Sequence, residues 1–253
     1  MRAWNFRGGW ADPLKMLWIC ERPEPIPVFN DDVGIVFAVV ADFGILLCAH
    51  PSCPDGQRSP WLRAVEFNKI VVVDGHAAVA VAGPAQASEG EKTDLVEASV
   101  GCVSGNPDAG LAAVHINRML DENKEDLLKF VRANPNIGPL PHPLLERPVV
   151  TCVINVGMGA SQPEARRTIL SDDGFVSDYL IERPGFAVGP FSCMAGLNRT
   201  LDIAAHQTDA ESAGVVVATA LRAHAERRVS AGSTTAVCVH IDVHGTLRTW
   251  EVH

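Results

Sequence analysis

The chain has 253 residues, of which 47% are hydrophobic and 20% charged, and its mean hydropathy is +0.11. This composition is typical of a compact soluble protein and disfavours a disordered, collagen-like or membrane chain. The 30 acidic residues outnumber the 21 basic ones and give a formal net charge of −9, which argues against binding to nucleic acid or to an anionic membrane surface.

The seven cysteines are an odd number spread through apolar stretches, whereas a small disulfide scaffold shows even numbers at close spacing. They predict mostly reduced thiols, as in the cytoplasm. The start of the chain lacks the long apolar core of an export signal, because its best candidate, residues 16–20, is far too short. The longest apolar run, residues 33–41, has nine residues, where a membrane helix needs about 20. We therefore expect a cytoplasmic protein without a membrane segment.

Residues 1–32 are predicted to be an N-terminal extension, and residues 33–253 a single folded domain. The extension carries three of the five tryptophans, and its prolines at 23, 25 and 27 exclude a helix there. Two hairpins then open the domain, each pairing two apolar β-rich runs across a glycine-containing turn. The first joins 33–41 to 45–50 and the second joins 68–73 to 76–82 through Asp74-Gly75.

A helix is predicted to begin at Asn106-Pro107-Asp108, because Asn can cap it, Pro suits its first position and Asp suits its positive end. Asn134-Pro135 should end it, since a proline disfavours helix in the residue before it. The apolar side chains expected to face the core are Leu111, Val114 and Met119, followed by Leu127, Leu128 and Val131.

A second group of strands is predicted at 149–155, 167–171 and 175–181, with a turn at Asp173-Gly174. The capping box at residues 208–211 then starts a helix that ends near Arg228. Its buried stripe is expected to contain Ala213, Val217, Ala220, Leu221 and His224. A final hairpin joins 234–243 to 246–252. Because hairpins connect most of the strands, we predict two antiparallel sheets with helices outside them.

The order and spacing of these pieces resemble the proteasome-type branch of the N-terminal nucleophile (Ntn) hydrolases, over roughly residues 33–252. The resemblance rests on residues 33–36 with 42–49, residues 68–70 leading to 80–83, the helix that starts at Asp209, and residues 172–174 followed by 186–189. It implies an α+β fold, a four-layer αββα sandwich of two antiparallel sheets flanked by helices. Residues 1–32 do not show the N-terminal helical signature of proteasome α subunits, so the β type is the nearer resemblance.

In that family the nucleophile is an N-terminal threonine exposed by self-cleavage, and its free amine is the base. This chain has no threonine before Thr93, and the resemblance places Gly34 at the nucleophile position. The preceding residues 31–33 are Asp, Asp and Val, which supply neither a hydroxyl nor a thiol. The family's strand lysine, which lowers the pKa of the nucleophile electrostatically, corresponds to Lys69.

Other family positions also differ. His50 stands where the family has an aspartate, and Arg227 replaces the aspartate of its Asp-x-x-Ser motif, although Ser230 matches the serine. Residues 189–192 read Gly-Pro-Phe-Ser where the family has Gly-Ser-Gly. The loss of several unlike elements together favours a site without proteolytic activity.

Three further constellations carry possible chemistry. Cys20 is the only thiol before the first strand, so processing ahead of it would create an N-terminal cysteine nucleophile; its plainer role is a small buried hydrophobe. Cys48, His50 and Cys53 could bind zinc, but a structural site needs four protein ligands and no second pair is evident, so we expect no metal. His240, Asp242 and His244 alternate along a strand, which suits a proton relay or, more simply, a solvated strand face.

The sequence thus predicts a proteasome β-subunit-like Ntn-hydrolase homologue that is a proteolytically silent pseudoenzyme. It is expected to act through a homo-oligomer or a proteasome-like assembly, without a cofactor. One alternative is an active peptidase or amidohydrolase with an unusual nucleophile, such as Cys20 after self-processing or an internal Ser or Cys. Another is a small-molecule binding or scaffold protein that uses the cleft in which the family has its active site. The candidate catalytic residues are Lys69, Ser230 and Cys20.

Overall fold

The computed structural model describes residues 35–49, 70–83, 95–106, 108–133, 149–188, 194–226 and 236–252, with the backbone alone at 194–195 and 224–226. This part of the chain contains ten strands and four helices. In chain order they are β1 (Val36–Ala41), β2 (Gly44–Ala49), β3 (Ile70–Val73), β4 (Ala77–Ala82), α2 (Leu95–Val103), α3 (Ala109–Ala133), β5 (Val149–Met158), β6 (Pro163–Ser171), β7 (Val176–Leu180), β8 (Gly185–Val188), α4 (Met194–Ala205), α5 (Ala210–Glu226), β9 (Ala236–Ile241) and β10 (Leu247–Val252).

The strands form two antiparallel five-stranded sheets. The first has the order β10-β9-β2-β1-β8 and the second the order β3-β4-β5-β6-β7. Neighbours in the sheets are mostly neighbours in the chain, as short hairpins require. The predictions of an α+β chain, of antiparallel sheets and of the three hairpins are confirmed.

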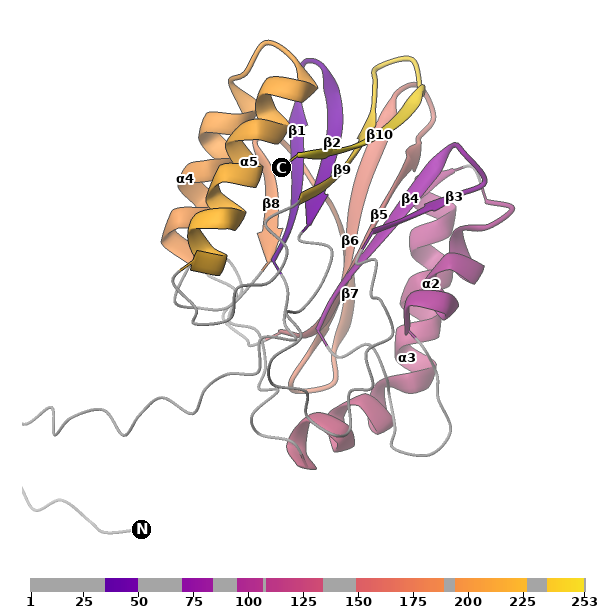
Figure 1. Cartoon of the computed structure of the whole chain (residues 1–253). Coiled ribbons are helices and arrows are strands. Elements are labelled where there is room, and N and C mark those ends of the chain that lie inside the picture. The colour runs from indigo at the N-terminus through magenta and orange to yellow at the C-terminus, as the bar shows by residue number, and fades with distance from the viewer. Residues whose placement is uncertain are drawn as a thin grey trace, which may run out of the picture.

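Alternation of side chains along the strands gives each sheet two apolar faces. The inner faces pack against each other, and this inter-sheet core includes Val36 and Leu47 of the first sheet and Ile154 and Ile169 of the second. The outer face of the first sheet packs against α4 and α5. The outer face of the second sheet packs against α2 and α3. Figure 1 shows the two helix pairs on opposite flanks of the paired sheets.

Two turns show why particular residues stand in them. At the β3–β4 turn, Asp74 and Gly75 have φ values of 53° and 72°, the left-handed pair that a tight hairpin requires and that Asp-Gly adopts readily. Gly44 begins β2 with a φ of 116°, and a Cβ there would lie 2.2 Å from the carbonyl oxygen of Ile241. A larger residue at position 44 would therefore push β9 away from β2.

Helix α3 differs from its prediction in cap and phase. Asp108, and not Asn106, caps it, because its Oδ1 accepts the Leu111 backbone N–H at 2.7 Å. Leu111 and Val114 are 48% and 62% exposed, so their assignment to the core was wrong. Apolar residues surround the first turns of α3, and the pattern there did not specify which face is buried. The side chains that face the core are Ala112, Ala113, Ile116, Met119 and Leu120, then Leu127, Leu128 and Val131 as predicted.

The sequence analysis missed helices α2 and α4. The nine residues of α2 contain three valines, a serine and a glycine, all of which have low helix propensity, so packing against the sheet must stabilise it. For α5, the cap is Asp209 in place of Thr208: its Oδ1 accepts the Ser212 backbone N–H at 2.8 Å. The predicted buried residues Ala213, Val217 and Leu221 are buried, and Ala220 is half-buried. The His224 side chain and Arg228 lie outside the described residues.

The phase of α3 can be tested with two leucines of the same helix. Leu120 is fully buried, so Leu120→Ala should lower the free energy of unfolding by about 2–5 kcal/mol through lost burial and a residual cavity. Leu111→Ala, at an exposed position, should lower it by less than about 1 kcal/mol. Urea denaturation followed by circular dichroism measures both. Equal losses would place Leu111 in the core after all.

Candidate functional site

The three predicted catalytic residues, Lys69, Ser230 and Cys20, lie outside the described residues, as do Gly34 and His50. The structure therefore describes only the framework next to the predicted site. The distances between these residues therefore lie outside what the structure describes.

The described framework at this site consists of three strand ends in the first sheet. Val36, the first residue of β1, is in register with Ala49 at the end of β2 and with Val188 at the end of β8. All three side chains are buried in the inter-sheet core. They form an apolar wall and supply no nucleophile, acid or base.

The second sheet contributes a row of residues that crosses all five strands. Ile70 of β3 pairs with Ala80, Ala80 with Ile154, Ile154 with Arg167 and Arg167 with Tyr179. The first three belong to the inter-sheet core. Arg167 lies between the core residues Ala165 and Ile169 along β6, so alternation directs its side chain towards the same core. Sequence reasoning missed this residue, although the period-2 pattern of β6 would have indicated it.

The guanidinium group of Arg167 connects the two sheets. Its Cζ lies 4.3 Å from the ring centroid of Phe186 in the opposite sheet and 5.2 Å from that of Tyr179, both within cation–π range. Burial lowers the pKa of Arg167 from its ordinary value, although an arginine stays protonated at neutral pH. Its Nε is buried without a hydrogen-bond partner. The structure thus holds a positive charge between the sheets by contact with aromatic rings.

The neighbouring Arg166 points to the other face of β6 and makes an ordinary ion pair. Its Nη2 donates to Asp178 Oδ2 at 2.6 Å and its Nε donates to the same oxygen at 3.2 Å. Glu164 lies farther off, at 3.6 Å. This pair, with both side chains about three-quarters or more buried, joins β6 to β7.

The alternating residues His240, Asp242 and His244 do not form a relay. Strand β9 ends at Ile241, so the two later residues lie in the following turn. His240 Nε2 is 2.9 Å from the Phe43 carbonyl oxygen, and its ring makes edge contacts with Phe43 and Trp250. Asp242 accepts the backbone N–H groups of His244 and Thr246, which lowers its pKa. These residues complete a strand and a turn.

Of the Cys48, His50 and Cys53 group, at which we expect no metal, the structure describes only Cys48. Its thiol lies on the outer face of the first sheet, in the core beneath α4 and α5, and contacts Cys238. His50 and Cys53 lie outside the described residues. Within the described ranges, no group of three or more His, Cys, Asp or Glu side chains is arranged to hold a metal ion.

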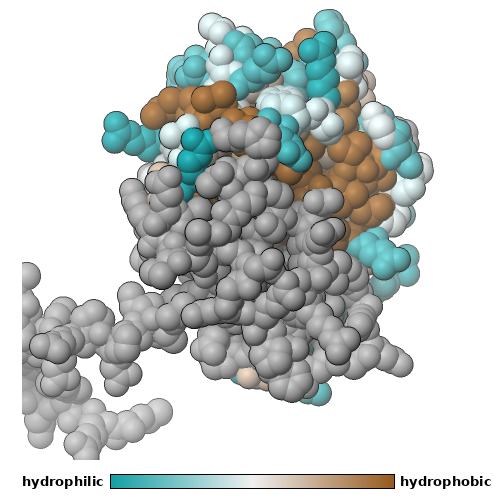
Figure 2. Space-filling view, viewed as in Figure 1, coloured by the Kyte–Doolittle hydropathy of each residue, from teal (hydrophilic) through white to brown (hydrophobic). Residues whose placement is uncertain are grey.

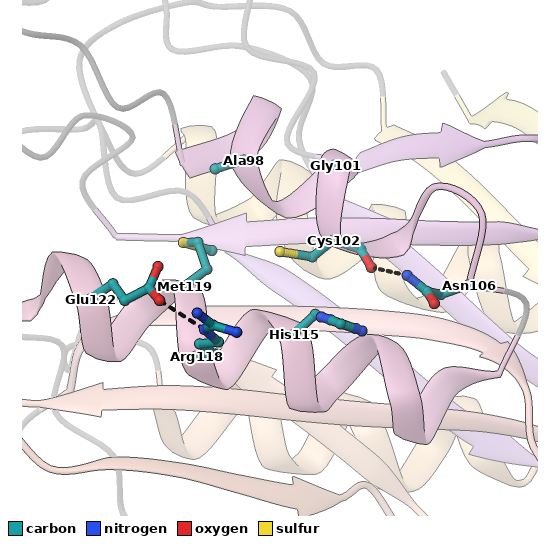
Figure 3. Close-up of a pocket in the computed structure, with 8 residues that line it drawn as sticks. All are labelled: Ala98, Gly101, Cys102, Asn106, His115, Arg118, Met119 and Glu122. Carbon is teal, nitrogen blue, oxygen red and sulfur yellow. Dashed lines mark hydrogen bonds and ion pairs between the residues drawn. The ribbon is translucent and has the colours of Figure 1, made fainter.

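A pocket of about 390 Å³ lies between α2 and α3 (Figure 3). It is lined by Ala98, Gly101, Cys102, Asn106, His115, Arg118, Met119 and Glu122. Arg118 Nε donates to Glu122 Oε1 at 2.8 Å, with the two side chains 79% and 59% exposed. Burial and then the charge of Glu122 raise the pKa of the Cys102 thiol, so it stays protonated at neutral pH and is a poor nucleophile. Because the sequence analysis missed α2, it missed this pocket too.

The chain has paired antiparallel sheets with helices packed on their outer faces, and the comparison with solved structures supports a proteasome-type fold. Two of the similar solved structures are those of Anbu from Hyphomicrobium sp. strain MC1, a bacterial proteasome-like protein of the Ntn hydrolases. One covers 86% of this chain and 87% of its own, with 11% identity and a TM-score of 0.51. Its Gly-1 mutant covers 87% and 86%, with 11% identity and a TM-score of 0.52. At this identity the similarity shows the fold alone.

Neither the protein-family models nor the curated proteins include a match to this sequence. In the described part of the chain, no helix is both long and apolar enough to cross a membrane.

Two neighbouring arginines allow a matched test of the charge between the sheets. Arg166→Met should destabilise the protein by about 1–3 kcal/mol, because it leaves the mostly buried Asp178 carboxylate without this partner. Arg167→Met should change the stability by less than about 1 kcal/mol, because the lost cation–π contacts are offset by removal of a desolvated charge. Urea denaturation at neutral pH measures both. If Arg167→Met lowered the free energy of unfolding by more than Arg166→Met does, the charge of Arg167 would be shown to stabilise the protein.

Proposed function

We propose that this protein is a proteasome β-subunit-like Ntn-hydrolase homologue that lacks the family's nucleophile, is proteolytically silent and acts through assembly. In this proposal residues 33–253 form a four-layer αββα sandwich, residues 1–32 precede it, and the protein works in the cytoplasm. The proteasome-type fold supports the family, and the start of β1 supports the loss of activity.

The position of β1 carries the proposal. The strand begins at Val36 and is directly preceded by Ile35, and the residues ahead of these are Asp31, Asp32, Val33 and Gly34. An Ntn hydrolase needs a hydroxyl or thiol at this place, beside a free amine. These four side chains offer neither, and the described strand ends around Val36 are apolar. Lys69 and Ser230 then remain as residues of a framework that has lost its reacting group.

Exposed apolar side chains support assembly. On α3, Leu111 and Val114 project into solvent as large exposed hydrophobic residues, and on the edge strand β3 Val71 is only half-buried. Figure 2 shows apolar residues at the surface on the right of this view, over the region in which Figure 1 places β3 and α2. Exposed apolar surface and edge strands are features that partner subunits commonly cover.

The absence of processing is tested first, by the intact mass of freshly purified protein after incubation with a β-lactone, an electrophile that acylates N-terminal nucleophiles. We expect a full-length, unlabelled chain, because no hydroxyl or thiol directly precedes β1. Cys20→Ala, which supplies neither a thiol nor a hydroxyl, is the matched control. A cut wild-type chain labelled at Cys20, with Cys20→Ala uncut or unlabelled, would contradict the silent homologue and support the active alternative.

Assembly is tested with one substitution on each pair of helices. Val114 on α3 and Val215 on α5 are 62% and 54% exposed, so a glutamate at either site should leave the fold intact. Light scattering coupled to size-exclusion chromatography should give an oligomer for the wild type and for Val215→Glu. It should give a smaller species for Val114→Glu, since a charge would be desolvated in the interface. A monomeric wild type would contradict assembly and leave the binding or scaffold role.

A further inference from the structure

Two cysteines lie directly opposite each other in neighbouring strands of the first sheet. Cys48 of β2 is in register with Cys238 of β9, and their Sγ atoms are 3.0 Å apart, although the residues are 190 positions apart in the chain. Both are free thiols. The separation is only about 1 Å longer than a disulfide bond, and directly opposite Cβ atoms on antiparallel strands are near the distance that a disulfide spans.

The surroundings hold the two thiols together and away from other partners. Both side chains are fully buried in the core between the first sheet and helices α4 and α5. Gly214 of α5 lies over Cys238, and a Cβ on it would be 3.4 Å from the Cys238 Sγ. The other described cysteines, Cys102 and Cys152, belong to clusters around the second sheet, on α2 and β5. Among the described cysteines, Cys48 and Cys238 are therefore each other's neighbour, and the other two lie elsewhere.

We propose that Cys48 and Cys238 form a redox modification site, at which hydrogen peroxide converts the two thiols into a cross-strand disulfide. One thiolate attacks a peroxide oxygen, which breaks the O–O bond, forms a sulfenic acid and releases hydroxide. The second sulfur then attacks the sulfenic sulfur, forms the S–S bond and expels the hydroxyl group. In sum, two thiols and one peroxide give one disulfide and two waters.

The geometry defines how this site behaves. Burial raises the pKa of the Cys48 thiol, so the reacting thiolate is scarce at neutral pH and oxidation should be slow and become faster as the pH rises. The disulfide would link β2 to β9 in the middle of the sheet, next to the pairing of Ala49 with Val36. This proposal does not depend on the proposed function, because it requires neither assembly nor a silent site.

The test is peptide mapping of the full-length wild-type chain treated with hydrogen peroxide at mildly alkaline pH, then unfolded and alkylated. We expect a cross-linked peptide pair containing Cys48 and Cys238, lighter than the separate peptides by two hydrogen atoms and cleaved by a thiol reductant. The oxidised chain should melt on the order of 10 °C higher than the reduced chain, because the link closes a long loop of the unfolded chain. The reductant should reverse this shift.

Matched variants separate this pair from the other cysteines. Cys48→Ala and Cys238→Ala should each abolish the cross-link and the stabilisation, whereas Cys152→Ala, at an equally buried thiol, should retain both. The wild-type map is decisive even where a variant does not fold. Alkylation of both Cys48 and Cys238 after full peroxide treatment, their conversion to sulfinic acids, or cross-links to other cysteines would overturn the proposal.

Discussion

The packing of one apolar sheet face on another is the constraint on which the rest of the structure depends. Strand alternation presents small and branched side chains to this layer, such as Ala38 and Val36 from the first sheet and Ala80 and Ile154 from the second. The outer faces of both sheets are apolar too, so they must also be covered, and the two helix pairs do this. The hairpins then require little more than turns that match the strand twist, as Asp74-Gly75 does.

This layer also defines what chemistry the fold can support. A catalytic group placed at the start of β1 would stand beside the apolar wall of Val36, Ala49 and Val188, where burial would strengthen its electrostatic interactions. In this chain residues 31–35, directly ahead of β1, carry no hydroxyl or thiol. Among the described residues, Arg167 carries its charge into the layer between the sheets. Its guanidinium group lies against the rings of Phe186 and Tyr179.

The first sheet has a second property that does not follow from the hydrophobic layer. Its outer face places Cys48 beside Cys238 beneath α5, where a Cβ on Gly214 would lie 3.4 Å from the Cys238 Sγ and 3.3 Å from the Trp250 ring. A pair of thiols in register is a consequence of the β2–β9 pairing. The connection between strands distant in sequence thus creates a redox-capable pair from two cysteines that are unremarkable by themselves.

Much of the fold could be predicted from the sequence because its signals are local. Alternation and glycine-containing turns predicted the hairpins, and helix-start signals with an apolar stripe predicted most of α3 and α5, although their caps are Asp108 and Asp209. The predicted strand 33–41 overlaps β1, which begins at Val36. The lack of a hydroxyl or thiol in residues 31–35 was also readable, since it depends only on the order of residues. Other features needed the tertiary structure. Helix α2 has weak intrinsic propensity and forms against β4, and the buried face of α3 was decided by its packing on the second sheet. The positions of Arg167 between the sheets and of Cys48 opposite Cys238 were decided by strand register, because register joins residues that no sequence spacing relates.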